Sequence, residues 1–437
     1  MASVPKLLLL TLLFILSCYR SHIAHAAGDD GSYKVLSVGS QSLRTNKSVC
    51  SESKAVRSSS GAATVPLHHR HGPCSPLPTK KMPTLEERLH RDQLRAAYIQ
   101  RKLSHSAKKG GRGGAGGDVQ QSHAATVPTT LGTSLNTLQY LITVRLGSPG
   151  KSQTMFIDTG SDVSWVQCKP CWQCHSQVDP LFDPRSSSTY SPFSCSSAAC
   201  AQLRQEGNGN GCSSSGQCQY IVRYGDGSVG TTGTYSSDTL ALGSNTVVSK
   251  FRFGCSHVES GFRDDDQTDG LMGLGGGAQS LVSQTAGTFG GTAFSYCLPP
   301  TPSSSGFLTL GAAGTSSGFV KTPMLRSRQD PTFYGVRLEA IRAEMMKQGY
   351  PPAPPSGGFL DTCFDLSGQS SVRIPAVALV FSGGAVVNLD ANGIMLQGSS
   401  SIVCLAFAAN SDDSSPGIIG NVQQRTFEVL YDVGRGA

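Results

Sequence analysis

The sequence has few charged residues and only one long hydrophobic run. Asp, Glu, Lys and Arg make up 15% of its 437 residues, whereas glycine occurs 51 times. This composition predicts a sheet-rich domain with many turns and argues against a helical bundle. The hydrophobic run, residues 7–16, is too short to cross a bilayer, and no later segment is long enough. We therefore expect no membrane span.

The same run has the features of a secretory signal peptide. Lys6 precedes it, and Ala24 and Ala26 flank His25 in a small-x-small cleavage pattern. Fourteen cysteines indicate an oxidising compartment and disulfide bonds. We expect residues 1–26 to be a signal peptide that directs the chain into the secretory pathway. The extracellular space or apoplast is the favoured destination, with the vacuole and the plastid as alternatives.

The charges are unevenly distributed along the chain. Residues 1–123 contain 18 Lys and Arg against 7 Asp and Glu, and the remaining residues contain 18 against 22. A basic leader on an acidic body is typical of a nucleic-acid-binding tail or of a pro-segment that covers an acidic cleft. The position after a signal peptide favours the pro-segment. We expect residues 27–125 to inhibit the body intramolecularly, and we expect no nucleic-acid partner.

The leader divides into three parts. Residues 27–83 look irregular. Thr84 and Glu87 form a capping box before a predicted basic amphipathic helix that continues to Arg101. Residues 104–125 are rich in glycine and form a predicted flexible linker. We expect processing in this linker.

The body contains one Asp-Thr-Gly triplet, Asp158-Thr159-Gly160, at the end of a predicted strand. Two close carboxylates that share one proton can activate a water as base and protonate a carbonyl as acid. Asp158 fits one half of such a pair. Gly160 would let backbone N–H groups approach its carboxylate, and the Thr159 and Ser161 hydroxyls could add hydrogen bonds. No second Asp-Thr-Gly or Asp-Ser-Gly occurs in the sequence.

Two glycine-rich stretches follow the triplet. Residues 220–228 predict a strand that leads into a hairpin. This hairpin could cover a cleft as a flap, with Tyr224 at its tip and Gly225 and Ser228 in its turn. Taken alone, Tyr224 is more often a packed strand aromatic. Residues 269–275 have apolar residues between glycines and could pass beneath the Asp-Thr-Gly loop, although alone they indicate only a turn.

The order of these three motifs resembles that of the pepsin-like aspartic proteases. A cysteine-rich insert between Cys168 and Cys218 and the leader stretch from His68 to Cys74 are similar to the plant nepenthesin-like, chloroplast-nucleoid-DNA-binding-protein-like subgroup. The resemblance implies a mostly β, bilobal acid-protease fold with one catalytic Asp per lobe, a flap, a removable pro-segment and a peptide substrate in the cleft. It implies a monomer without a cofactor. We expect the lobes at residues 126–325 and 326–437.

The second half of the catalytic pair is missing from this pattern. Residues 332–341 resemble the entry strand of the family's second lobe, and residues 418–425 resemble the partner of its second Asp loop. Between them the family carries a second Asp-Ser/Thr-Gly, which this chain lacks, so we expect an incomplete second lobe. Asp361 precedes Thr362, but Cys363 stands where glycine is required. We therefore reject Asp361 as a substitute.

The cysteines favour disulfides over a metal site. Cys168, Cys171 and Cys174 have metal-like spacing, and His175 could add a fourth ligand. A secreted chain nevertheless favours disulfides, so we expect no metal.

Eleven cysteines follow the leader, which is an odd number. We expect Cys297 to be unpaired, because its partner in the family is a final cysteine that this sequence does not contain. The expected pairs are Cys363–Cys404 and, less firmly, Cys195–Cys218 enclosing Cys200–Cys212.

Three functional interpretations follow. The first is an active aspartic endopeptidase precursor, which needs a second carboxylate. The second is a noncatalytic binding or inhibitory protein that uses the same cleft, as in the plant xylanase inhibitors that resemble this fold. The third is an incomplete gene model or splice product of an active protease, which the loss of a whole block favours. We expect the chain as written to fold poorly and to lack acid-protease activity.

Overall fold

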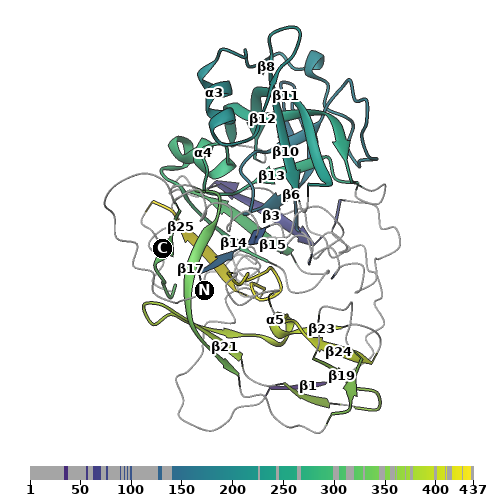
Figure 1. The fold of residues 1–437 in the computed structure, drawn as a ribbon, viewed down its shortest axis with the longest axis vertical. Helices are drawn as coiled ribbons and strands as arrows, with labels where there is room; N and C mark the ends of the chain where they lie inside the picture. Colours follow the sequence, from purple (N-terminus) through teal and green to yellow (C-terminus); the bar gives the residue numbers. More distant parts are fainter. Residues whose placement is uncertain are drawn as a thin grey trace, which may run out of the picture.

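The computed structural model describes the leader at residues 34–37, 56–57, 63–69 and several positions from 75 to 100, then residues 126–129 and, with short gaps, residues 140–434. The protein is mostly β and bilobal, as predicted. Strands of the first lobe fill the upper half of Figure 1 and strands of the second lobe the lower half. Strands from the leader and from the C-terminal region lie between them.

One large sheet contains the strands of the first lobe. Its main path runs in the order β25, β14, β15, β3, β5, β6, β13, β7, β12, β11, β10, β9. Two short strands, β2 and β8, pair with β3 and β11. The bounds are β2 Val56–Arg57, β3 Ala63–His69, β5 Tyr140–Leu146, β6 Lys151–Asp158, β7 Trp165–Gln167, β8 Ser191–Pro192, β9 Gly209–Cys212, β10 Cys218–Tyr224, β11 Val229–Ala241, β12 Val247–Ser260, β13 Gly270–Gly273, β14 Ala293–Cys297, β15 Ser305–Leu310 and β25 Glu428–Asp432.

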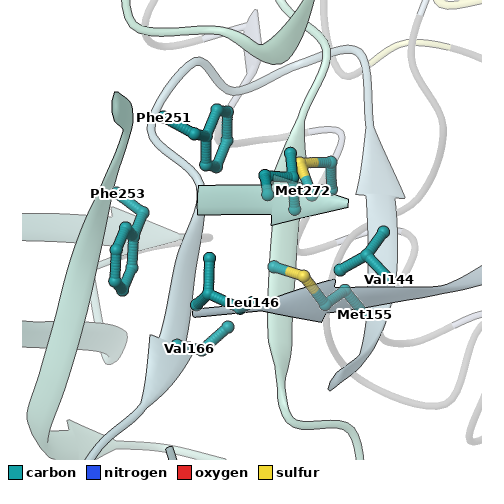
Figure 2. A pocket seen from close by; sticks show the side chains of 8 residues that line it. Val144, Leu146, Met155, Val166, Phe251, Phe253 and Met272 are labelled. Atoms are coloured by element: carbon teal, nitrogen blue, oxygen red, sulfur yellow. The ribbon is translucent and has the colours of Figure 1, made fainter. Parts of the chain in front are cut away.

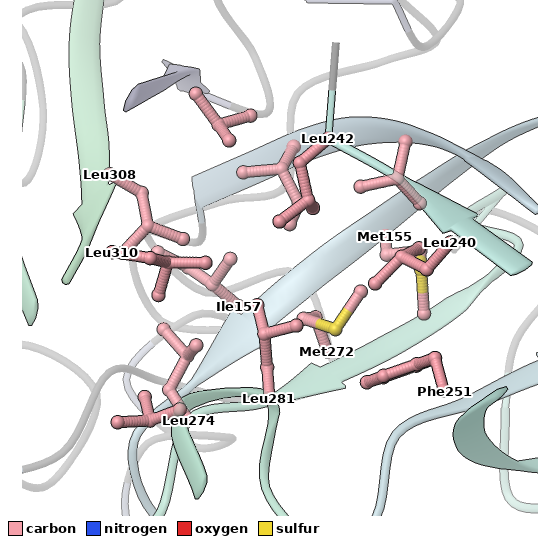
Figure 3. Close-up of a cluster of buried hydrophobic side chains, with 14 of the residues drawn as sticks. Met155, Ile157, Leu240, Leu242, Phe251, Met272, Leu274, Leu281, Leu308 and Leu310 are labelled. Atoms are coloured by element: carbon pink, nitrogen blue, oxygen red, sulfur yellow. The ribbon is translucent and has the colours of Figure 1, made fainter. Parts of the chain in front are cut away.

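Local sequence explains the strand that carries Asp158. β5 and β6 pair antiparallel, with Leu141 opposite Phe156, and Gly147 begins the connecting turn with a φ of +89°. A backbone in that region favours glycine. The last six residues of β6 are all buried, so both of its faces are covered by other parts of the protein. Figure 3 shows Ile157 of β6 within the apolar cluster of the first lobe.

A small cavity lies inside this apolar core. Figure 2 shows its lining, which comes from β5, β6, β7, β11, β12 and β13. Every lining side chain is apolar, so the cavity offers no polar group to orient a ligand. We therefore treat it as a gap in the packing. The lining residues are Val144, Leu146, Met155, Val166, Leu240, Phe251, Phe253 and Met272.

The leader contributes strands to this architecture, and the expectation that residues 27–83 are irregular is wrong. β3 lies between β15 and β5 and pairs with β15 over six residues, from Ala63–Leu310 to His68–Ser305. Its Val65 and Leu67 side chains are buried in the core of the first lobe. Pro66 argues against a central strand in the local sequence, because proline has no N–H to donate to a neighbouring strand. The strand forms here because β3 pairs with the distant strands β15 and β5.

Other early elements of the chain, in the leader and directly after it, contact the second lobe. β1 (Lys34–Ser37) pairs with β20 (Ser371–Ile374), and β4 (Thr126–Thr129) pairs with β17 (Tyr334–Ala343). The described positions between 89 and 100 are helical, as predicted for this segment, whereas the capping-box residues Thr84 and Glu87 lie outside the described residues. Leu89 of this helix is buried beside Cys363 and Cys404.

The second lobe consists of two small sheets around its own apolar core. One sheet has the order β16, β17, β21, β22, and the other has the order β18, β19, β24, β23. The bounds not yet given are β16 Met324–Leu325, β18 Pro352–Ala353, β19 Cys363–Asp365, β21 Val377–Phe381, β22 Val386–Leu389, β23 Met395–Gln397 and β24 Ile402–Leu405.

Four short helical segments have clear caps. The Ser197 hydroxyl accepts from the Cys200 backbone N–H at the start of α3 (Ala198–Gln205), and Ser280 does the same for Ser283 in α4 (Leu281–Phe289). Such side chains satisfy backbone donors that have no partner within the helix. The other two segments are η2 (Pro184–Ser186) and α5 (Ala391–Ile394).

The disulfides correct part of the expected connectivity. Cys363 is bonded to Cys404, the pair that the sequence favoured. The nested arrangement of the insert is wrong, because the observed bonds are Cys195–Cys212 and Cys200–Cys218. α3 turns Cys200 inward against the buried Cys218, whereas Cys212 is exposed and Cys195 is partly exposed. The two buried cysteines therefore bond to each other, and the two more exposed cysteines form the other disulfide.

Two further findings concern the remaining cysteines. Cys168 is bonded to Cys255 and Cys171 to Cys174, so the disulfide interpretation of this spacing is confirmed. Cys297 is disulfide-bonded, and the expectation that it is unpaired is wrong. Its partner lies outside the described residues, because the other ten described cysteines pair with one another.

Candidate functional site

The Asp158 loop is held by backbone hydrogen bonds. Asp158 is the last residue of β6 and is fully buried. Its Oδ1 atom accepts from the Gly160 backbone N–H at 2.9 Å, and its carbonyl oxygen accepts from the Leu274 N–H at 2.7 Å. The carboxylate is therefore fixed by its own turn, as the sequence predicted for Gly160. The Ser161 hydroxyl, which we expected to contribute, has no hydrogen-bond partner within the described residues.

The segment after Asp269 runs directly beside this loop. β13 lies parallel to β6, with Leu271 opposite Phe156 and Gly273 opposite Asp158. Gly273 is needed there, because a Cβ at this position would lie 2.3 Å from the Asp162 carbonyl oxygen. No real Cβ tolerates that approach. The prediction that residues 269–275 support the Asp-Thr-Gly loop is confirmed.

Asp162 joins the Asp158 loop to the start of the second lobe. One oxygen of its carboxylate accepts from the Gly277 N–H at 2.8 Å, and the other accepts from the Thr332 hydroxyl at 2.6 Å. Thr332 also accepts from the Gly276 N–H through its carbonyl oxygen, at 2.9 Å. The sequence showed Asp162 as part of the motif but gave no sign of this link, because Thr332 lies far along the chain.

Tyr334 completes this junction. Its hydroxyl donates to the Leu274 carbonyl oxygen at 2.8 Å. Burial, with a smaller contribution from the negative charge of Asp162, raises the pKa of Tyr334 well above its ordinary value. The hydroxyl therefore keeps the proton that it donates.

The predicted flap is a hairpin of β10 and β11. Tyr224 is the last residue of β10 and pairs with Val229 of β11. Its side chain is buried, and its hydroxyl accepts from the Trp165 Nε1–H at 2.8 Å. Tyr224 therefore lies beside the turn and not at its tip. Ser228 is exposed in the turn, and Gly225 lies outside the described residues.

A pair of carboxyl groups, Asp179 and Asp269, lies at the other end of β13. The Asp269 carboxylate accepts from the Thr154 N–H at 2.6 Å and from the Asp179 N–H at 3.2 Å. Burial, followed by a hydrogen bond with the Asp179 carboxyl group, raises the pKa of Asp269 to about 8. The sequence did not predict this pair, because Asp179 comes from the cysteine-rich insert. Both residues are held by β6, so we assign them a structural role.

The described residues of the second lobe contain no turn that matches the Asp158 loop. Asp361 lies outside the described residues, and the Cys363 that follows it is in strand β19. The stretch predicted to support a second Asp loop is partly buried around Ile419, whose carbonyl oxygen accepts from Gln424 Nε2 at 2.7 Å. The sequence encodes no Asp-Thr-Gly or Asp-Ser-Gly that could lie beside this stretch.

Comparison with known proteins identifies the family. Family models described as xylanase inhibitor N-terminal and xylanase inhibitor C-terminal match residues 140–312 and 303–437. An aspartyl protease family protein of Arabidopsis thaliana is 37% identical, and the match covers 87% of each chain. This chain belongs to the pepsin-like aspartic protease family. Aspartyl protease AED1 of Arabidopsis thaliana is 33% identical, with 99% of this chain and 98% of the relative covered.

A further relative agrees with this assignment, and a solved structure agrees with the fold. Aspartic proteinase nepenthesin-2 of Nepenthes gracilis is 31% identical, and the match covers 72% of this chain and 79% of that protein. The crystal structure of soybean basic 7S globulin has a TM-score of 0.56 at 20% identity, covering 71% of this chain and 93% of that one. At this identity the likeness concerns the fold alone.

Among the described residues, no helix is long and apolar enough to cross a membrane. No group of three or more His, Cys, Asp or Glu side chains in the described part of the chain is arranged to hold a metal ion.

Proposed function

We propose that this chain derives from an aspartic endopeptidase precursor and carries one half of its catalytic pair, so that it does not hydrolyse peptides by itself. The proposal rests on one observation: the Asp158 loop is present, whereas the second Asp loop that a catalytic pair needs is not encoded. The Asp158 loop is complete and buried, with its β13 support in register. The sequence contains no second Asp-Thr-Gly or Asp-Ser-Gly. One carboxyl group cannot act as base and acid in the same step.

An incomplete gene model or a splice product accounts best for this contrast. The alignment with the AED1 relative spans 478 positions, which exceeds the 437 residues of this chain. That relative therefore carries residues that have no counterpart here. Sequencing the transcript between the codons of Ile341 and Glu344 tests the idea, because an in-frame block with Asp-Thr-Gly or Asp-Ser-Gly is expected there.

A protease assay tests the lack of activity. The full chain is incubated with haemoglobin at pH of about 3 to 4, where a shared-proton pair works, with and without pepstatin. No pepstatin-sensitive digestion is expected, and Asp158→Asn should not alter the background. Digestion that pepstatin blocks and Asp158→Asn abolishes would overturn the proposal.

A noncatalytic binding role is the second candidate, favoured by the pairing of β10 with β11 and by the intact Asp158 loop. It requires a protein or peptide that binds the cleft without being cleaved. Under both functions we propose a monomer from the secretory pathway whose leader covers the cleft until processing. Calorimetric titration with pepstatin separates the two candidates, because only the second one expects the cleft to bind a peptide-like ligand.

A further inference from the structure

We propose that His175 of the cysteine-rich loop is a positioning residue for the flap, acting on Tyr224 through Phe262 and Trp165. This proposal rests on the proposed function only because it treats Tyr224 as part of the site. Trp165 fluorescence and trypsin cleavage test it, and both report the state of the flap without requiring catalysis. Failure of the proposal therefore remains distinguishable from failure of the proposed function.

The His175 ring is fixed by hydrogen bonds on both nitrogens. Nδ1 lies 2.6 Å from Glu259 Oε2, and Nε2 lies 2.8 Å from the Thr268 carbonyl oxygen. Both the His175 and Glu259 side chains are 2% exposed. A carbonyl oxygen only accepts, so Nε2 carries a proton and donates it. One further proton lies between Nδ1 and the Glu259 carboxylate, and either position of that proton keeps the ring in the same orientation.

Glu259 is itself held in place. Its second carboxylate oxygen accepts from the Ser256 hydroxyl at 3.2 Å, and Ser256 accepts from the Thr231 hydroxyl at 2.8 Å. Ser256 and Glu259 belong to β12, and Thr231 belongs to the flap strand β11. The cysteine-rich loop is therefore attached to the base of the flap through a continuous buried polar network.

The aromatic rings connect His175 to the flap tyrosine. The Phe262 ring stacks on the His175 ring at a centroid distance of 5.2 Å and an interplanar angle of 19°. Phe262 also contacts the Trp165 indole edge-to-face at 5.4 Å. Trp165 Nε1 then donates to the Tyr224 hydroxyl. These contacts form a continuous series of rings from His175 to Tyr224.

The backbone beside Phe262 touches the flap turn as well. A Cβ at Gly261 would lie 2.7 Å from the Ser228 carbonyl oxygen and 2.8 Å from a Val229 methyl group. The segment that carries Phe262 thus packs directly on the turn. Fixing the ring on His175 fixes this contact too. The cysteine-rich insert, through this contact, limits how far the flap opens.

Fluorescence of Trp165 provides the first test. The chain has two tryptophans, of which Trp172 is 72% exposed and Trp165 is buried. Trp172→Phe in the full chain leaves Trp165 as the only indole. Adding His175→Asn keeps a donor for Glu259 but removes the stacked ring. We expect a red-shifted emission and severalfold stronger acrylamide quenching.

His257→Asn is the matched control. His257 lies two positions before Glu259 on β12, and its ring faces Trp172 rather than Phe262. It should leave the Trp165 signal unchanged. Equal spectra for the His175 and His257 variants, with both folded by circular dichroism, would overturn the proposal. If His175→Asn does not fold, the pair His175→Asn with Glu259→Gln removes the buried carboxylate charge and gives the same test.

Trypsin provides a second readout, because cleavage within the flap reports the opening of the hairpin itself. Arg223 is exposed on β10 next to Tyr224, and cleavage after it requires the hairpin to open. Mass spectrometry of the peptide that begins at Tyr224 measures the rate. We expect roughly two- to tenfold faster cleavage in Phe262→Leu and His175→Asn, the factor expected for the loss of one aromatic contact. Rates equal to that of His257→Asn would contradict the assignment.

Discussion

Replacing Asp269 by asparagine should remove a pH dependence from the stability of the first lobe. The pKa of Asp269 is raised from its ordinary value of 3.8 to about 8 in the folded protein. Between these two values the folded state holds a proton that the unfolded state has lost. The free energy of unfolding therefore falls as pH rises through this window and is constant below it.

The structure sets the size of the effect. Asp269 is fully buried next to Asp179, so solvent screens its charge very little. Each pKa unit corresponds to about 1.4 kcal/mol, so the loss of stability between pH 4 and pH 8 from this group is on the order of 3 to 5 kcal/mol. Asparagine cannot ionise, so the free energy of unfolding of Asp269→Asn should fall by that much less between pH 4 and pH 8.

Urea denaturation followed by tryptophan fluorescence at pH 4, 6 and 8 measures this difference. Asp183→Asn is the control, because Asp183 is a partly exposed carboxylate of the same lobe with a surface partner in Lys169. Its curve should run parallel to that of the unmodified chain. If the free energy of unfolding depended on pH equally in the unmodified chain and in Asp269→Asn, the reasoning would be refuted, since no proton would then be taken up at Asp269 on folding.

Three further changes test the packing around the site. Thr332→Val removes the hydroxyl that donates to the Asp162 carboxylate and should lower the free energy of unfolding in urea by about 1 to 3 kcal/mol; no change would exclude the link between the lobes. Leu67→Ala should cost about 2 to 5 kcal/mol in thermal or chemical unfolding, whereas the partly exposed His68→Ala should cost little; equal costs would place β3 outside the core. Gly273→Ala should prevent recovery of folded, soluble chain, because its Cβ meets a backbone oxygen; normal yield would contradict the geometry.

The sequence predicted the Asp158 site well because its signals are local. An apolar strand, a tight Asp-Thr-Gly turn and glycines in residues 269–275 each restrict the backbone within a few residues. The register of β13 on β6 follows from those restrictions, since only glycine permits the close approach at Gly273. The β fold and the leader helix were predictable for the same reason.

Contacts that depend on distant partners could not be predicted in this way. The link between Asp162 and Thr332 and the carboxyl pair of Asp179 and Asp269 join segments that are far apart in the chain. The insert cysteines allow several connectivities, and only the inward turn of Cys200 on α3 selects among them. These features come from packing between elements, which spacing in a sequence does not record.

The position of β3 between β15 and β5 has a consequence for how the chain folds during synthesis. β3 is synthesised early but cannot pair with β15 until β15 has been synthesised, and β14 likewise cannot pair with β25 until the end of synthesis (Figure 1). Pairings with such large sequence separation form slowly. Until residues 428–432 leave the ribosome, β14 presents an unpaired edge that can associate with other chains. We expect the yield of this protein to depend on chaperones that shield nascent strand edges.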